Sequence, residues 1–74
     1  MYLKFFDGTK LRIGNASRFK ISPNTEHDEI YDLKVSPCGG TFETISNHHG
    51  KENARRILQQ ILDAINRGDK VFEI

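Results

Sequence analysis

The 74-residue chain has one cysteine, two prolines and no long hydrophobic run, and each scarcity excludes a class of protein. A single cysteine, Cys38, cannot form an internal disulfide, which excludes the disulfide-stapled secreted scaffolds common at this size. No apolar segment approaches the roughly 20 residues that cross a bilayer. The opening residues place Lys4 in a strand-like pattern followed by Asp7 and Gly8, unlike a signal peptide. We therefore expect a soluble protein of a reducing cytoplasm.

The chain also lacks a large excess of positive or negative charge. The chain has 11 Lys+Arg against 10 Asp+Glu, a formal net charge of +1 with the histidines neutral. This balance supplies neither the field of a dedicated nucleic-acid binder nor the acidity of a DNA mimic. With 36% hydrophobic and 28% charged residues, the chain is too apolar and too mixed in charge to be disordered.

The length predicts a single domain over residues 1–74 with a thin core. A chain this small buries only about 60% of the surface that its unfolded form exposes. Further apolar burial at a subunit interface would stabilise it, so we expect a homo-oligomer, most simply a two-fold dimer. Whether such a dimer uses a sheet edge or an open sheet face is left undecided by the sequence.

The strongest local pattern is a β-hairpin at the start of the chain. A two-residue loop at Asp7 and Gly8 would put Leu3 and Leu11 on opposite faces of the hairpin. A three-residue loop over residues 6–8, with Gly8 in the left-handed position of a bulge, instead pairs Leu3 with Leu11 on one face. The alternation of apolar residues therefore favours the bulged hairpin.

Further strands follow from the same alternation. Residues 16–22 and 29–35 alternate apolar and polar side chains and are separated by the polar, turn-rich residues 23–29. Residues 41–45 predict a short fifth strand, with either Phe42 or the pair Thr41 and Ile45 facing inward. Residues 71–74 predict a terminal strand at a sheet edge of this subunit or of a neighbour.

One long helix is expected over about residues 51–67. Apolar residues recur there at intervals of three and four, which forms a continuous stripe, and Gly68 follows as a C-terminal cap. Ser46, Asn47 and Gly50 are the candidate N-terminal caps. The fold class is therefore α+β, an antiparallel sheet of four to six strands with one long helix packed on one face. The expected core comprises Leu3, Phe5, Leu11, Ile13, Phe19, Ile21, Tyr31, Leu33, Ile57, Leu58, Ile61 and Ile65.

Neither a metal site nor a catalytic site is predicted. His27, Cys38, His48 and His49 are the soft ligands available, but they lack the paired spacing of structural zinc modules. Cys38 with His48 or His49 would make a nucleophile and base only if the fold brought them together. We expect no cofactor and no enzymatic activity.

Basic residues on the outer faces of the first three strands form the candidate binding surface. They are interleaved with Tyr2, which could stack on a base, and two arginines near the positive end of the helix could receive phosphate groups. Acidic residues on neighbouring strands, Asp32 and Glu43, could instead neutralise the same surface. The predicted site comprises Tyr2, Lys4, Lys10, Arg12, Arg18, Lys20, Arg55 and Arg56.

The C-terminal part of the chain, HHGKENARRILQQILDAINRGDKVFEI, resembles short hypothetical proteins of phages and prophages of Gram-positive bacteria. In that class a strand and turn lead into a helix with an E-x-A-x-x-I-L-x-x-I pattern, then A-I-x-x-G and a terminal strand. The matching residues are Glu52, Ala54, Ile57, Leu58, Ile61, Ala64, Ile65, Gly68, Phe72, Glu73 and Ile74.

The resemblance implies a non-catalytic protein of a mobile element, in some cases an inhibitor of host defence that binds a host protein or a nucleotide signal. Two other functions stay open, a structural or oligomerisation module and a minimal nucleic-acid-binding domain. No membrane partner is expected.

Overall fold

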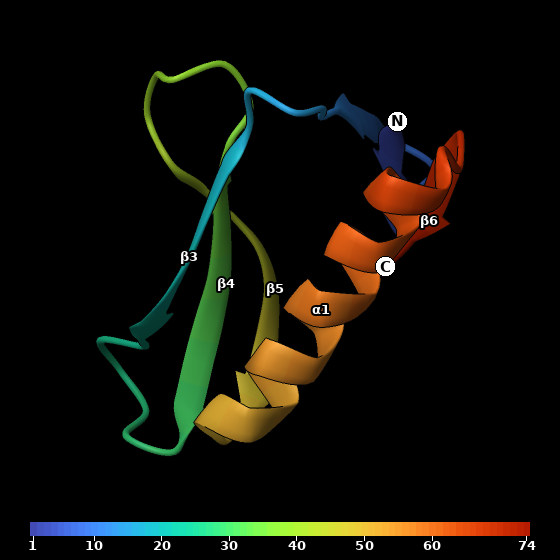
Figure 1. Ribbon diagram of the computed structural model, residues 1–74. Helices are drawn as coiled ribbons and strands as arrows, with labels where there is room; N and C mark the ends of the chain where they lie inside the picture. The colour runs from blue at the N-terminus through green and yellow to red at the C-terminus, as the bar shows by residue number, and fades with distance from the viewer.

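The computed structural model describes residues 1–74 and contains one helix and six strands (Figure 1). This confirms the α+β class. The elements are β1 (Tyr2–Lys4), β2 (Lys10–Arg12), β3 (Arg18–Pro23), β4 (Ile30–Ser36), β5 (Glu43–His49), α1 (Lys51–Arg67) and β6 (Val71–Glu73).

The strands form two three-stranded sheets, ordered β2-β1-β6 and β3-β4-β5, where one sheet was expected. The chain leaves the first sheet through a turn in which the Ser17 N–H donates to the Gly14 carbonyl, and the Gly14 N–H donates to Ser17 Oγ. The Ser17 hydroxyl also donates to the Pro37 carbonyl at 2.8 Å. This contact ties the turn to the second sheet, in which β3 pairs with β4.

The β1–β2 hairpin has the predicted three-residue loop. Leu3 lies opposite Leu11, and the Phe5 N–H donates to the Thr9 carbonyl at 2.8 Å. Gly8 has φ +90°, a conformation that side chains other than glycine rarely adopt. The apolar alternation therefore sets the register of the hairpin correctly.

The last strand, β6, lies at the edge of the first sheet and runs parallel to β1. Leu3 is paired with Phe72. The Tyr2 N–H donates to the Lys70 carbonyl at 2.8 Å, and the Ile74 N–H donates to the Lys4 carbonyl at 3.0 Å. The terminal strand is thus accommodated within its own subunit.

Strand β5 continues to His49, well beyond the predicted end at residue 45. The polar run after Ile45 resembles a loop in the sequence, but it pairs with β4 as far as Ile30. A bulge opposite Leu33 makes room for Ile45, which is buried, whereas Thr41 is exposed. Ser46 and Asn47 therefore belong to a strand and do not cap the helix.

Helix α1 has the predicted bounds. It begins after Gly50, which provides no side-chain cap, and ends at Gly68 with φ +78°. The Gly68 N–H donates to the Ile65 carbonyl and the Asp69 N–H to the Ala64 carbonyl, each at 3.0 Å. These bonds satisfy carbonyl groups that a helix end would otherwise leave free.

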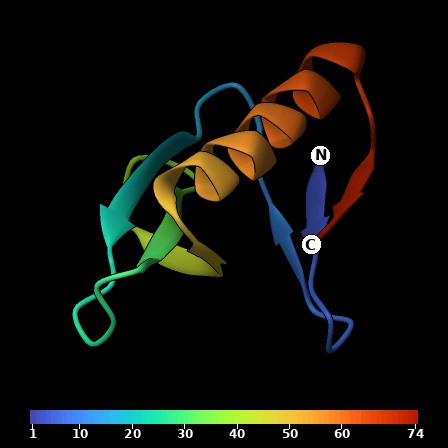
Figure 2. The same cartoon turned by 90° about the horizontal axis from the view of Figure 1, so that it is seen from below.

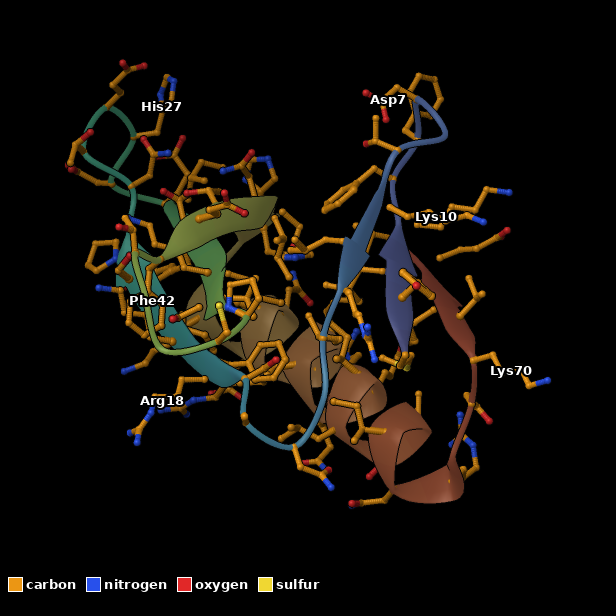
Figure 3. The ribbon with its side chains drawn as sticks, turned by 90° about the horizontal axis from the view of Figure 1, so that it is seen from above. Asp7, Lys10, Arg18, His27, Phe42 and Lys70 are labelled. Atoms are coloured by element: carbon orange, nitrogen blue, oxygen red, sulfur yellow. The ribbon has the colours of Figure 1, made fainter.

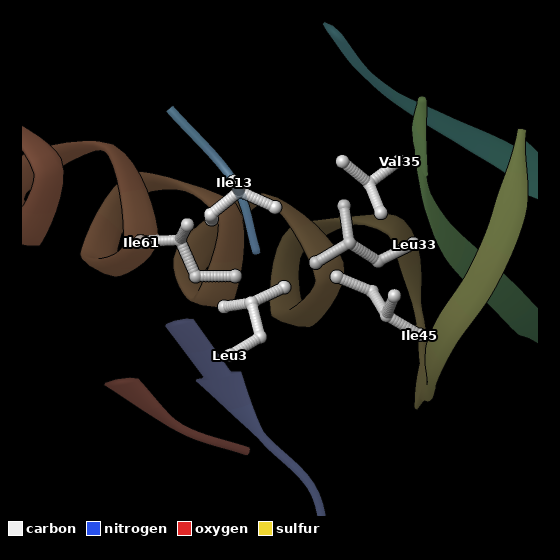
Figure 4. Packing of buried hydrophobic residues seen from close by; sticks show 6 residues of the cluster. All are labelled: Leu3, Ile13, Leu33, Val35, Ile45 and Ile61. Carbon is white, nitrogen blue, oxygen red and sulfur yellow. The ribbon is translucent and has the colours of Figure 1, made fainter. Parts of the chain in front are cut away.

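The core lies where both sheets meet the helix (Figure 4). Leu3 of β1, Leu33 of β4 and Ile61 of α1 are fully buried. Ile13, Val35 and Ile45 complete the buried cluster, and the last two were not in the expected core. Most other expected core residues pack against this cluster while partly buried, namely Phe5, Leu11, Phe19, Ile21, Ile57, Leu58 and Ile65. Tyr31 is only half-buried.

The two sheets diverge from the helix, which crosses both of them (Figure 2). The β1–β2 hairpin and the β3–β4 loop project on the side away from the helix (Figure 2). The helix lies across one side of the two sheets, and on the side toward the hairpin tip a groove lies between them.

Candidate functional site

The division into two sheets separates the predicted basic residues into groups. Lys4, Lys10 and Arg12 lie on the first sheet, whereas Arg18 and Lys20 lie on β3 of the second sheet. Figure 3 shows Lys10 and Arg18 pointing to opposite sides of the molecule. The predicted residues therefore do not form one continuous surface.

The helix carries a further part of the predicted set. Arg55 and Arg56 are exposed on α1, and Arg55 Nη1 lies 3.1 Å from Glu52 Oε1. On the second sheet, Lys20 Nζ lies 4.5 Å from the centre of the Phe42 ring. Arg55 and Lys20 thus already have partners within the chain.

The largest group of predicted site residues that lie next to one another is on the outer face of β2-β1-β6. We call Tyr2, Lys4, Lys10, Arg12 and Val71 the basic face. Cross-strand pairing places Tyr2 between Arg12 and Val71, and it places Lys4 opposite Lys10. Lys4 Nζ lies 3.9 Å from Glu73 Oε1, so the basic face includes one weak ion pair at its edge. Tyr2 and Val71 are each 43% exposed, so an aromatic and an aliphatic side chain lie among the cations.

The basic face is a surface and not a binding hollow. Of the four hollows in the structure, one is lined by Lys4 and another by Arg12, and none contains two residues of the predicted cationic set. A nucleotide held by several convergent cations would need them around one concavity. The basic face is therefore an open surface without such a concavity.

A second surface, which the sequence did not predict, is the groove between the two sheets. It has a volume of about 610 Å³ and is lined by Phe5, Phe6, Asp7, Thr9, Ile45, Ser46 and Ile74. Phe6 is fully exposed, with a relative exposure of 102%, at the tip of the hairpin. We call this site the tip groove.

The polar groups of the tip groove already have partners within the chain. Asp7 Oδ1 accepts hydrogen bonds from Thr9 Oγ1 at 2.7 Å and from the Thr9 N–H at 3.0 Å, and these bonds, chiefly the one from the hydroxyl, lower the pKa of Asp7. Ser46 Oγ and His48 Nε2 lie 2.7 Å apart. An apolar side chain could thus enter the groove without leaving these groups unpaired.

Asp32 is the centre of a polar cluster on the second sheet. It is 9% exposed, and its Oδ1 accepts from Asn24 Nδ2 at 3.1 Å and from Asn47 Nδ2 at 2.6 Å. These hydrogen bonds, chiefly the one from Asn24, lower the pKa of Asp32. Asn24 Oδ1 in turn accepts from the backbone of Glu26 and His27, so the cluster anchors the β3–β4 loop. Its role in the fold is structural.

The fold does not bring Cys38 close to His48 or His49. Cys38 lies in the turn before β5, and His48 and His49 lie at the far end of that seven-residue strand. His48 is next to Ser46, and partial burial lowers the pKa of His48 below its usual 6.5. No carboxylate hydrogen-bonds to this ring, so the pair lacks the third group that orients a catalytic base. No three His, Cys, Asp or Glu side chains are grouped to hold a metal ion.

Sequence reasoning missed the tip groove because it depends on the angle between two sheets, which local periodicity does not encode. The signal that was present is Phe6, an aromatic residue in a turn where polar residues are usual. The helix is too short and too polar to span a bilayer. No known protein family, curated protein or solved structure matches the chain.

Proposed function

We propose that the protein is a non-catalytic binding module that acts by stoichiometric binding of a protein partner through the basic face. The observation that carries this proposal is the uncovered outer side of β2-β1-β6, where Tyr2 and Val71 lie among three cations. Tyrosine and arginine are enriched in protein interfaces and dominate their binding energy. The partner surface that fits is flat and acidic, with an apolar centre to cover Tyr2 and Val71.

The resemblance of the C-terminal part to phage proteins extends this proposal. In that setting the partner is a protein of the bacterial cytoplasm, and binding inhibits a host defence system. The flatness of the basic face favours a host protein over a nucleotide signal, and its separation from Arg18 and Lys20 disfavours an extended nucleic-acid track.

A tagged pull-down from bacterial lysate tests the proposal, with the protein and small-molecule fractions both identified. We expect Arg12→Glu to abolish retention of the partner because the reversed charge faces its acidic surface. Arg18→Glu is the matched control, since Arg18 is equally a strand arginine and exposed but lies on the other sheet. The control is expected to retain the partner.

Three results would contradict the proposal. If the Arg12→Glu variant still retains the partner, the basic face is not the binding surface. A bound compound absorbing near 260 nm would indicate a nucleotide ligand. A shift of DNA or RNA probes that weakens steeply with salt would indicate nucleic-acid binding.

A further inference from the structure

The tip groove and Phe6 together form a self-complementary surface. Phe6 projects fully into solvent from the hairpin tip, and the same residue lines the groove beside it. The projecting side chain and the concavity therefore belong to one patch. Such a patch can bind its own copy about a two-fold axis, which closes the assembly at two chains, whereas a knob and a hole on distant patches would form open chains.

The hairpin tip is ordered before any partner arrives. Gly8 in the left-handed conformation, the Gly8 N–H bond to the Phe5 carbonyl at 2.9 Å and the two Thr9 bonds to Asp7 fix the turn. Phe6 is thus presented on a rigid support, which reduces the entropy lost on binding.

The exposed surface of the chain is also larger than its mass requires. A compact monomer of 8.5 kDa exposes about 4,650 Å², whereas this chain exposes 5141 Å². The difference is about 490 Å² per copy, and two copies that bury it would lose about 980 Å². The excess belongs to the whole elongated chain, which measures 34 × 23 × 23 Å. A dimer that buried an equal area would reach the lower size limit of specific interfaces, roughly 1,000 Å² in total.

The chemistry of the groove favours an aromatic side chain over a polar ligand. Phe5, Ile45 and Ile74 supply its apolar wall, and Asp7, Thr9 and Ser46 are hydrogen-bonded within the chain. Phe6 of a second molecule fits this environment.

We propose that the protein forms a closed dimer in which Phe6 of each copy enters the tip groove of the other. The tip groove is lined by no residue of the basic face, so this inference does not rest on the proposed function. Either proposal can fail without the other.

Sedimentation equilibrium of the full chain in reducing buffer, from about 1 μM to about 1 mM, tests the dimer. The reductant prevents a disulfide between two copies at the exposed Cys38. We expect wild type to approach twice 8.5 kDa and Phe6→Ser to raise the dissociation constant by at least about 30-fold, as expected for loss of a buried aromatic anchor. Leu62→Ser is the matched control, because Leu62 is an exposed apolar residue that lines no hollow, and it should dimerise as wild type does.

Backbone amide signals locate the interface by NMR. In wild type, the signals of Ser46 and Ile74 should shift with concentration, and in Phe6→Ser they should not. A wild type that stays near 8.5 kDa throughout would overturn the proposal, and so would a dimer that Phe6→Ser leaves intact. If wild type is monomeric but loses a captured host protein on Phe6→Ser, the groove binds that protein and not a second copy.

Discussion

Asn47 on β5 donates a hydrogen bond of 2.6 Å to the carboxylate of Asp32 on β4, and Asn24 donates to the same carboxylate from the end of β3. Asp32 thus connects all three strands of the second sheet through side chains as well as through the backbone. Because two amide groups point their N–H donors at it, the position favours an ionised carboxylate over any neutral group of the same shape.

Replacing Asp32 with asparagine should destabilise the second sheet. The amide oxygen of the new residue would accept the two bonds to Oδ1 without a negative charge, and its Nδ2 would replace Oδ2, which accepts from Asn24 Nδ2 at 3.4 Å, so that third contact would be lost. We expect a lower urea midpoint at neutral pH for Asp32→Asn. Asp28→Asn, in the exposed loop before β4, is the control and should match wild type.

The same group makes stability depend on pH in the acidic range. The pKa of Asp32 is lowered from 3.8 in the folded protein, so its contribution is fully present above about pH 3.8 and is lost as pH falls through the folded value. The urea midpoint of wild type should therefore fall more steeply below about pH 4 than that of Asp32→Asn. Parallel curves for the two proteins would show that Asp32 does not supply this dependence.

His48 should add a second pH dependence nearer neutrality. Burial lowers its pKa in the folded state, so the unfolded chain binds the proton more readily. Stability is fully present above about pH 6.5 and declines as pH falls below it. We expect His48→Gln to show a smaller decline between about pH 7 and about pH 5, measured by urea unfolding. His27→Gln, in the exposed β3–β4 loop, should keep the wild-type decline.

Ile61 and Leu62 are neighbours on α1 with different burial. Ile61 is fully buried and Leu62 is 36% exposed. Ile61→Ala should lower the free energy of unfolding by about 2 to 5 kcal/mol because it removes contacts to both sheets and leaves a cavity. Leu62→Ala should cost less than about 1 kcal/mol. Equal losses of stability at the two positions would contradict the burial of Ile61 and the exposure of Leu62.

The periodicity of the sequence was sufficient for the elements whose side chains alternate between core and solvent. Leu3 and Leu11 determine the register of the hairpin, and the apolar stripe determines the bounds of α1. The second half of β5 was missed because its polar side chains bond to one another and to β4, as Asn47 does to Asp32, where they resemble a loop. The burial of Ile45 depends on a bulge, which the alternation of apolar and polar residues does not predict.

The division of the strands into two sheets also could not be predicted from local sequence patterns. The turn between the two sheets is joined to the second sheet by a contact between Ser17 and Pro37, which are far apart in the sequence. The tip groove follows from that division, whereas the basic residues were identified individually and only their grouping was missed. Side-chain type is visible in a sequence, but which residues share a surface is decided by long-range packing.

The parallel pairing of β1 with β6 has a consequence for the order in which the chain folds. The second sheet is built from neighbouring antiparallel strands, and its contacts need only short loops to close. Pairing of Leu3 with Phe72 must close almost the whole chain into a loop, which is entropically expensive until the helix has docked. Addition of β6 is thus expected as the last step, so Phe72→Ala should accelerate unfolding and leave the folding rate nearly unchanged in stopped-flow measurements.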